Sequence, residues 1–248
     1  MLLLAAGVVL LSAALAHSYF ALLEAPWLKV REIQALGLKH VERKQVLNAV
    51  MVPRGTSIFG LKMRELASKV EALAWVKSAV VRLDLPGRMV VEVVEREPMA
   101  LVQAEDVFLM DTEGKLFARA GGAYDRQELL LFTGFSGLGL HEGSHLPSEA
   151  LDDLRELLAA LDKKKGWLPV GSISECRWSA GAGFQILPSQ IPAPVHLGLD
   201  DYELKLDRLH RVIGLLQERQ WSGSVTLIDL DYSNRAYIEG QFGAPKDG

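Results

Sequence analysis

The sequence predicts an α+β protein in three parts: an N-terminal transmembrane helix, a β-α-α-β-β unit, and a curved, mostly antiparallel sheet with helices on one face. An uncharged apolar run opens the chain, and helical patterns flanked by strand patterns follow it. The remainder contains many short strand patterns between turn residues, together with two long helical patterns. We therefore expect the parts to be residues 1–27, 28–98 and 99–248.

The N-terminal run is long enough to span a membrane. Residues 1–23 contain no Asp, Glu, Lys or Arg, and a helix of this length can cross a hydrocarbon core about 30 Å thick. A cleaved signal peptide is the alternative, because Ala14-Leu15-Ala16 fits the small-x-small cleavage pattern. The apolar run continues to Leu23, which favours an uncleaved anchor. Three aromatic residues suit the far-side aromatic belt: Tyr19, Phe20 and Trp27. No Lys or Arg precedes the run, so we expect that a cytoplasmic tail is missing and that the remaining residues are exported.

The second part has the pattern of strand, helix, helix, strand, strand. A strand is predicted over residues 28–35 and a short helix over 41–50. Apolar residues at helical spacing predict a clear helix over 63–74: Met63, Leu66, Ala67, Val70, Leu73 and Ala74. Alternating apolar residues then mark two strands joined at Pro86-Gly87: Ala79, Val81, Leu83 and Leu85, then Met89, Val91 and Val93. Pro98 is expected to close this pair.

The third part alternates strands with two long helices. A hairpin is predicted over residues 107–118, around Glu113-Gly114, and a helix over 148–164. A second helix is predicted over 200–219, with Asp200 and Glu203 as its N-terminal cap. Further strands are predicted at residues 129–132, 173–179, 183–188, 195–198, 224–231 and 235–242, with a turn at Ser233-Asn234.

A zinc site is the sharpest chemical alternative. The motif HEGSH, residues 141–145, matches H-E-x-x-H, which on a helix places two histidines on one face and a glutamate as general base. However, Gly143 lies inside the motif, and glycine costs about 1 kcal/mol in a helix. No other histidine lies in a recognisable downstream motif that would supply a third ligand. We therefore expect an exposed loop without zinc, and Pro147 should open the helix that follows.

Other catalytic patterns also fail. The stretch 134–138 (GFSGL) departs from G-x-S-x-G at its last position. The lone Cys176 rules out an intrachain disulfide and is expected to be a buried core residue. The net charge is -4, and no basic patch suggests a nucleic-acid partner. These features favour an exported binding or scaffold module without catalytic residues, metal or cofactor.

Three stretches resemble one protein family, in the same order along the chain. They are residues 74–102 (AWVKSAVVRLDLPGRMVVEVVEREPMALV), 108–117 (FLMDTEGKLF) and 227–238 (LIDLDYSNRAYI). The first contains a W-V segment, a Pro-containing turn and an E-x-E/R-x-P-x-A stretch, here Trp75-Val76, Pro86 and Glu95-Arg96-Glu97-Pro98-Met99-Ala100. The second fits a D-x-x-G-x-x-F hairpin, and the third an I-D-L-R-Y-x-N-R-x-x-V ending. Together they resemble the FtsQ/DivIB cell-division family, and the block from Val30 to Leu101 resembles a POTRA domain.

The resemblance implies that residues 28–98 form a POTRA domain and residues 99–248 an FtsQ-type β domain. It also implies a non-catalytic, single-pass inner-membrane protein with its bulk in the periplasm, concentrated at the division septum. Its partners would be the bitopic FtsB–FtsL pair and, through that pair, the septal peptidoglycan synthase FtsW–FtsI. The alternative is a POTRA-type module of outer-membrane protein assembly or secretion, which would not concentrate at midcell.

The last strand is the expected partner-binding edge, because nothing that could cover its outer side follows it in the sequence. An incoming strand would pair with its free N–H and C=O groups, and Arg208 or Arg211 would offer charge. The expected contact residues are Asp231, Tyr232, Asn234, Arg235, Ala236, Tyr237, Ile238, Gly240 and Phe242. Asp231 stands where the family commonly has Arg, so Asp231→Arg is expected to strengthen binding to an acidic partner segment.

Overall fold

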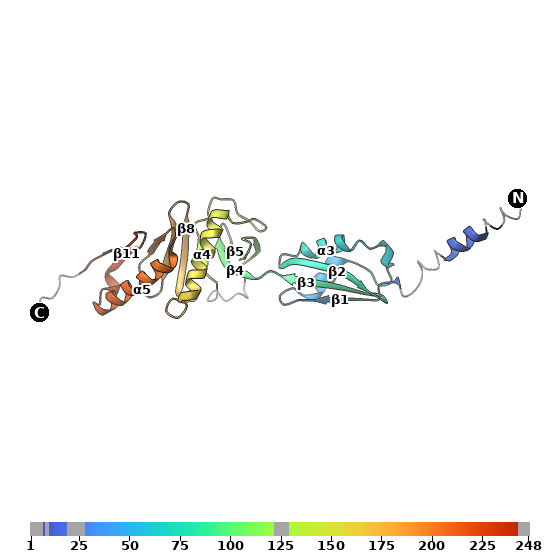
Figure 1. Cartoon of the computed structure of the whole chain (residues 1–248), viewed down its shortest axis with the longest axis horizontal. Helices are drawn as coiled ribbons and strands as arrows, with labels where there is room; N and C mark the ends of the chain where they lie inside the picture. Colours follow the sequence, from blue (N-terminus) through green and yellow to red (C-terminus); the bar gives the residue numbers. More distant parts are fainter. Residues whose placement is uncertain (1–6, 8–9, 19–27, 122–128, 243–248) are drawn as a thin grey trace. The chain divides into compact units, whose positions relative to one another are not determined.

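The computed structural model of the chain describes residues 7, 10–18, 28–121 and 129–242, and these divide into two compact units (Figure 1). The first unit is Met1–Arg96 and the second is Glu97–Gly248. Most of the predicted anchor lies outside the described residues, although residues 10–18 are helical. No helix in the described ranges has both the length and the apolar character that crossing a bilayer requires.

The first unit has the predicted β-α-α-β-β order. Its elements are β1 (Glu32–Leu36), α2 (Arg43–Val50), the 3-10 turn η2 (Ile58–Gly60), α3 (Met63–Glu71), β2 (Val76–Asp84) and β3 (Arg88–Glu95). The described strands form one sheet in the order β1-β3-β2, in which β1 runs parallel and β2 antiparallel to the central β3. The two longest strands, β2 and β3, are therefore neighbours, with β3 in the centre of the sheet and β2 at one edge.

The core of the first unit lies between this sheet and the two helices. The predicted inner face of β3 is confirmed, because Met89, Val91 and Val93 are all buried. Leu66 and Val70 of α3 are buried against them, as helical spacing requires. Strand β1 begins later than predicted, because the residues before it bond to the loop after α2 instead: the Val30 N–H donates to the carbonyl of Thr56 at 2.9 Å.

The second unit is built on one long mixed sheet. Its strands are β4 (Pro98–Gln103), β5 (Val107–Asp111), β6 (Leu116–Arg119), β7 (Leu131–Thr133), β8 (Ile173–Ser179), β9 (Gly183–Pro188), β10 (Val195–Gly198), β11 (Val225–Asp229) and β12 (Tyr237–Gly240). Its helices are α4 (Ser148–Lys164) and α5 (Tyr202–Glu218), with 3-10 turns η3 (Val170–Ser172) and η4 (Ser222–Ser224). In the described residues the strand order is β12-β11-β10-β9-β8-β7-β4-β5-β6.

The sheet is mostly antiparallel, as predicted, but it also contains parallel pairs that local patterns did not indicate. Parallel pairs join β4 to β7, β7 to β8 and β10 to β11, so the sheet is mixed, although most of the described pairs are antiparallel. The β2–β3 pair ends at Glu95, shortly before Pro98, and Pro98 itself opens β4 and lies opposite Asp111 in β5. Proline is tolerated as the first residue of a strand, where its missing N–H breaks no interior ladder bond.

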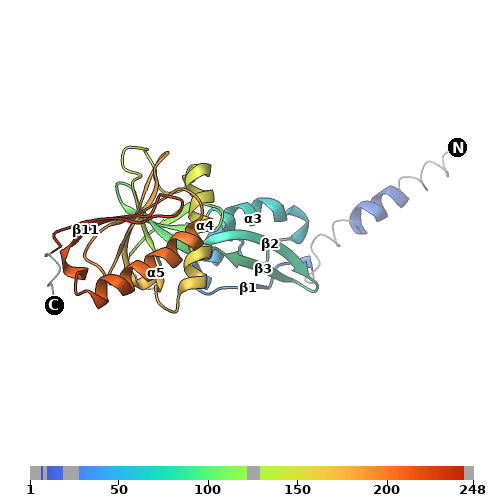
Figure 2. The same ribbon diagram turned by 60° about the vertical axis from the view of Figure 1, so that its left-hand side comes forward.

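Helices α4 and α5 pack against each other and cover the same face of the sheet (Figure 2). The predicted helix over residues 148–164 is confirmed, as is the buried stripe of α5: Leu206, Leu209, Ile213 and Leu216. Cys176 is buried in this core, and burial raises the pKa of its thiol, with the charge of Glu175 adding to the effect. The predicted cap of α5 is wrong. Asp200 and Asp201 are both left-handed (φ 57° and 49°), not extended as an N-cap requires, and no side-chain cap bond forms.

Candidate functional site

The end strand β12 is the candidate site. It pairs antiparallel with β11, and no other strand in the described part of the chain lies on its far side. Its short length, Tyr237–Gly240, leaves a small open edge rather than a long one. The prediction of a sheet-edge strand at this position is therefore confirmed, while its use by a partner stays a prediction.

The backbone groups that face the open edge follow from the ladder. The Ile228 N–H in β11 donates toward β10 at 3.0 Å, so the neighbouring residues of β11 face β12. Their partners on β12 are Tyr237 and Glu239, whose N–H and C=O groups are therefore used inside the sheet. By alternation, the N–H and C=O groups of Ile238 and Gly240 point outward. These are the groups that an added strand would meet.

The side chains of β12 also alternate between the two faces of the sheet. Ile238 lies opposite the buried Ile228 and packs against the core on the face that α5 covers. Tyr237 and Glu239 therefore point to the opposite face, which no described helix covers. Tyr237 is 55% exposed. The edge thus presents an apolar side and a polar side.

A hollow of about 310 Å³ lies on the apolar side, between α5 and β12. It is lined by Val212, Leu215, Leu216, Arg219, Trp221, Ile238 and Phe242. The Trp221 and Phe242 rings contact each other, with centroids 5.1 Å apart, and the Arg219 guanidinium lies 5.1 Å from the Trp221 ring centroid. Leu215 is 55% exposed within this surface. An incoming chain could place a large apolar side chain here.

Arg208 of α5 holds the turn between β11 and β12. Its guanidinium donates to backbone carbonyls on both sides of this turn: Leu230, Tyr232, Ser233 and Arg235. The bond to Ser233 is 2.6 Å long. The expectation that Arg208 offers its charge to a partner is therefore replaced by an internal role, and among the two predicted arginines Arg211 is the more exposed.

Asp231 also contacts the protein itself. Its Oδ1 lies 2.9 Å from the Lys205 ammonium, which also donates to the Leu199 carbonyl. The Lys205 side chain is 9% exposed and that of Asp231 is 45% exposed. A Cβ on Gly198 would lie 1.9 Å from Asp231 Oδ1, so the carboxylate fills the space beside this glycine. Asp231 thus neutralises a buried cation, and a partner contact by it stays a prediction.

The other predicted contact residues lie around β12. Tyr232, Asn234 and Arg235 are exposed in the preceding turn, and Ala236 is half-buried against the core. A Cβ on Gly240 would lie 2.4 Å from the Ser224 carbonyl oxygen, so glycine permits a close approach. The sequence-based prediction missed five lining residues of the hollow: Val212, Leu215, Leu216, Arg219 and Trp221. One of them could have been found from the sequence, because Leu215 is an apolar residue outside the predicted buried stripe of α5.

The HEGSH stretch forms a loop, as predicted. Residues 141–145 contain no helical residue, and the His141 N–H donates to Ser144 Oγ at 3.1 Å. Across the described ranges, no three His, Cys, Asp or Glu side chains gather as a metal site requires. The backbone of the loop instead bonds to β6, where the Gly143 N–H donates to the Leu116 carbonyl at 2.7 Å. The motif is therefore part of the sheet's architecture.

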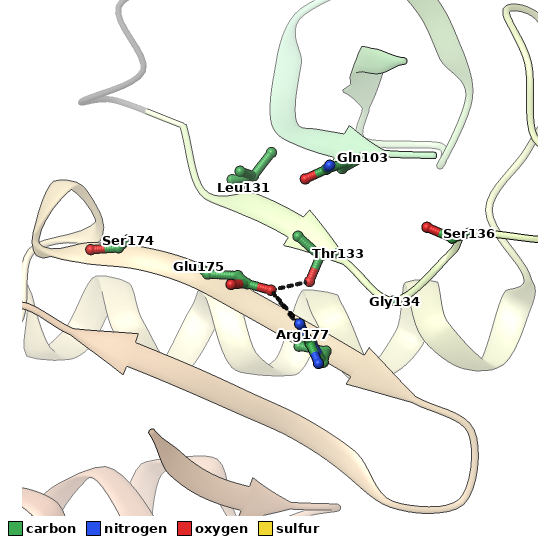
Figure 3. Close-up of a pocket in the computed structure, with 8 residues that line it drawn as sticks. All are labelled: Gln103, Leu131, Thr133, Gly134, Ser136, Ser174, Glu175 and Arg177. Carbon is green, nitrogen blue, oxygen red and sulfur yellow. Dashed lines mark hydrogen bonds and ion pairs between the residues drawn. The ribbon is translucent and has the colours of Figure 1, made fainter. Parts of the chain in front are cut away.

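A second hollow, of about 480 Å³, lies on the helix-free face of the sheet (Figure 3). Figure 3 labels its lining residues: Gln103, Leu131, Thr133, Gly134, Ser136, Ser174, Glu175 and Arg177. The Thr133 hydroxyl donates to Glu175 Oε1 at 2.7 Å, and Arg177 Nη2 lies 3.3 Å from the same oxygen. The opposite charges of Glu175 and Arg177 neutralise each other in an ion pair, so the hollow offers mainly uncharged hydrogen-bonding groups. The sequence had given no sign of it.

Comparison with known proteins connects both units to one family. Residues 28–96 match the family model of the POTRA domain, FtsQ-type, and residues 100–231 match that of the cell division protein FtsQ/DivIB, C-terminal. The chain is therefore a POTRA-containing cell-division protein. It belongs to the FtsQ/DivIB family. The second match ends at Asp231, so the case for β12 as a binding edge comes from its geometry.

Curated relatives cover both units. The cell division protein FtsQ of Geotalea daltonii is 28% identical over 211 residues, which are 85% of this chain and 75% of the relative. That of Syntrophotalea carbinolica is 28% identical over 218 residues, 88% of this chain and 76% of the relative. That of Anaeromyxobacter sp. strain K is 30% identical over 202 residues, 82% and 68%. The similarity thus extends over most of the chain.

Proposed function

We propose that this protein is a non-catalytic scaffold of the divisome. Residues 1–27 anchor it in the inner membrane, residues 28–98 form its POTRA domain, and residues 99–248 its β domain in the periplasm. At the septum it recruits an FtsB–FtsL-like pair of bitopic proteins. Through that pair it holds an FtsW–FtsI-like peptidoglycan synthase. Membership of the cell-division family supports this role.

The open outer side of β12 is the observation that carries the proposal. A sheet edge with unused N–H and C=O groups can receive a strand from another chain, and such pairing supplies affinity without any catalytic residue. In this chain the groups of Ile238 and Gly240 face that edge. A strand of the FtsB-like partner would pair with them and extend the sheet beyond β12.

The neighbouring side chains add contact area. Tyr237 is exposed beside the edge on the helix-free face, and the hollow lined by Ile238 and Phe242 lies on the other face. Aromatic side chains of this kind commonly anchor interfaces, because they bury a large area at a low entropic cost. The exposed turn at Tyr232, Asn234 and Arg235 would meet the flanking part of the partner.

The test compares Ile238→Pro with Ile238→Ala in the full chain, reconstituted in nanodiscs. Both variants shorten the side chain, but only proline removes the outward N–H. We expect proline to weaken capture of the FtsB-like partner by about tenfold or more relative to alanine. Tyr237→Pro is a poorer test, because by the ladder geometry the Tyr237 N–H serves the pairing with β11. Equal affinities of the proline and alanine variants, with both folded, would show that edge pairing is not the binding mode.

A further inference from the structure

The two faces of the β12 edge differ in polarity and charge. On the face covered by α5, the apolar hollow has Arg219 at its rim, and Arg211 and Glu218 are both exposed on the same helix. On the helix-free face, Glu239 lies on β12 and Asp229 lies opposite Tyr237 on β11. The edge is therefore apolar on one side, with the Arg219 cation at the hollow, and acidic on the other.

This asymmetry matters because backbone pairing alone does not fix the register of an added strand. The outward groups of Ile238 and Gly240 accept any extended chain. A slip by one residue, however, moves every side chain of the incoming strand to the opposite face. The side chains beside the edge must therefore decide which alternate residues of the partner face α5.

Resting on the function proposed above, we propose that β12 selects an extended segment in which large apolar residues alternate with lysine or arginine. The apolar residues face α5, and one enters the hollow beside Trp221 and Phe242. The basic residues face the opposite side and meet Glu239. This alternation fixes the register of the docked strand.

Glu239 is the residue that reads the basic side. Its side chain is exposed, and no cation among the described residues forms an ion pair with it. Opposite charges on neighbouring strands stabilise a sheet, whereas like charges destabilise it. Asp229 adds negative charge on the same face, although His196 Nδ1 lies 3.3 Å from its Oδ1. Arg235 precedes the ladder and lies in the turn, outside the paired residues.

The opposite face disfavours the reverse arrangement. A lysine placed in the hollow would lose its hydration among apolar side chains and lie near the Arg219 guanidinium. A second copy of this chain is also a poor occupant, because its own Glu239 would bring a like charge to the same short edge. Charge complementarity thus favours a different chain with a basic, apolar alternation.

The test uses the full chain in nanodiscs and two capped synthetic peptides of equal length. One alternates leucine with lysine, and the other alternates leucine with glutamate. We expect the lysine peptide to bind about fivefold more tightly, and Glu239→Lys to reverse the preference by a similar factor. Glu149→Lys changes the net charge equally at the exposed start of α4, toward the β6 side of the sheet, where a Cβ on Gly114 would meet the Leu151 side chain. This control should leave the preference unchanged.

The outcomes separate this inference from the proposed function. In one outcome, peptide binding is lost in Ile238→Pro but not in Ile238→Ala, while Glu239→Lys does not reverse the preference. That result would support edge pairing and overturn the proposal that Glu239 selects basic residues. Equal shifts in Glu239→Lys and Glu149→Lys would also overturn it, because they indicate only a net-charge effect. Binding that Ile238→Pro leaves intact would contradict edge pairing itself. Failure of both peptides to bind, or dimerisation of the chain through β12 that neither peptide competes with, would overturn the selection of this alternation.

Discussion

The two ends of the long sheet are finished differently. At one end, the loop that contains HEGSH lies along β6: the Leu116 N–H donates to the Ser144 carbonyl at 2.9 Å, and the Leu116 carbonyl accepts from the Gly143 N–H at 2.7 Å. At the other end, no described segment pairs with the outer side of β12. One edge strand is thus covered at its start by the chain's own backbone, whereas no described segment covers the other.

The difference teaches where to look for a partner. An unprotected strand edge invites unwanted pairing, so proteins usually cover, shorten or charge it. The loop covers the start of β6 at Leu116, so less of the backbone edge stays open at this end of the sheet than at β12. The glycine that disqualified HEGSH as a zinc helix is also useful in this role, because Gly143 has a left-handed φ of 92° that lets the loop turn against Leu116.

Exposing the edge of β6 should remove the difference between the two ends of the sheet. Among the predicted changes, this one should cause the largest loss of stability. Gly143→Pro cannot adopt the native φ and loses the N–H that reaches Leu116, so we expect a loss of roughly 3 kcal/mol in the free energy of unfolding. The freed edge should also cause concentration-dependent self-association. Denaturant unfolding and sedimentation velocity of the detergent-solubilised full chain measure the two effects.

Gly137→Pro is the matched control, because Gly137 also has a left-handed φ, of 85°, but lies outside the segment that bonds to Leu116. It should lose stability through strain without associating. Association of both variants to the same extent would mean that loop damage, rather than an uncovered β6, causes it.

A second prediction extends the comparison to the first unit, where a carboxylate rather than a backbone ladder fixes a loop against the sheet. Glu95 at the end of β3 accepts hydrogen bonds from the backbone N–H groups of Lys39, His40 and Val41 at 2.7 to 3.0 Å. Its side chain is 4% exposed. Glu95→Gln should cost about 1–3 kcal/mol, because an amide group accepts fewer of these bonds. Glu92→Gln, on the exposed face of β3, should cost far less.

The loss should depend on pH in a defined direction. Burial raises the pKa of Glu95, but hydrogen bonds from the backbone of Lys39, Val41 and His40 and from the His40 ring outweigh it, so the pKa is lowered from 4.5. The ionised form is thus favoured in the folded state, and its contribution is complete above pH 4.5 and is lost as pH falls through the lowered value. Unfolding curves of wild type and Glu95→Gln should converge in acid. A constant difference across that range would contradict this account.

Local patterns in the sequence predicted most elements, because each depends on residues close together in the chain. The helix over 148–164 and the strands over 173–179, 183–188 and 195–198 match the structure residue for residue. The parallel pairing of β4 with β7 and of β10 with β11 joins segments far apart in the sequence, and no local pattern encodes it.

The candidate site was only partly predictable for the same reason. The strand pattern over residues 235–242 indicated β12, but Trp221 and Arg219 join the hollow only because α5 packs beside that strand. The engagement of Arg208 with the turn carbonyls also depends on this packing. Contacts between elements cannot be inferred from the charge of one residue. The charge of Arg208 therefore suggested a partner contact, whereas in the structure Arg208 bonds within the protein.

Asp231→Arg is the prediction with the smallest expected effect. It tests whether the Asp231 side chain, next to the open backbone edge, acts within the protein or contacts a partner. The substitution removes the carboxylate that lies 2.9 Å from the Lys205 ammonium and places a second cation beside it. Because the Asp231 side chain is 45% exposed, solvent screens the pair, and we expect a loss of about 1 kcal/mol in the free energy of unfolding. Asp231→Asn, which keeps the shape beside Gly198, should lose about half as much, since it removes the attraction but adds no repulsion. Denaturant unfolding at low and high salt measures both, and salt should narrow the gap between them. If Asp231→Arg were as stable as wild type and bound the FtsB-like partner more tightly, the side chain would act at the interface rather than on Lys205.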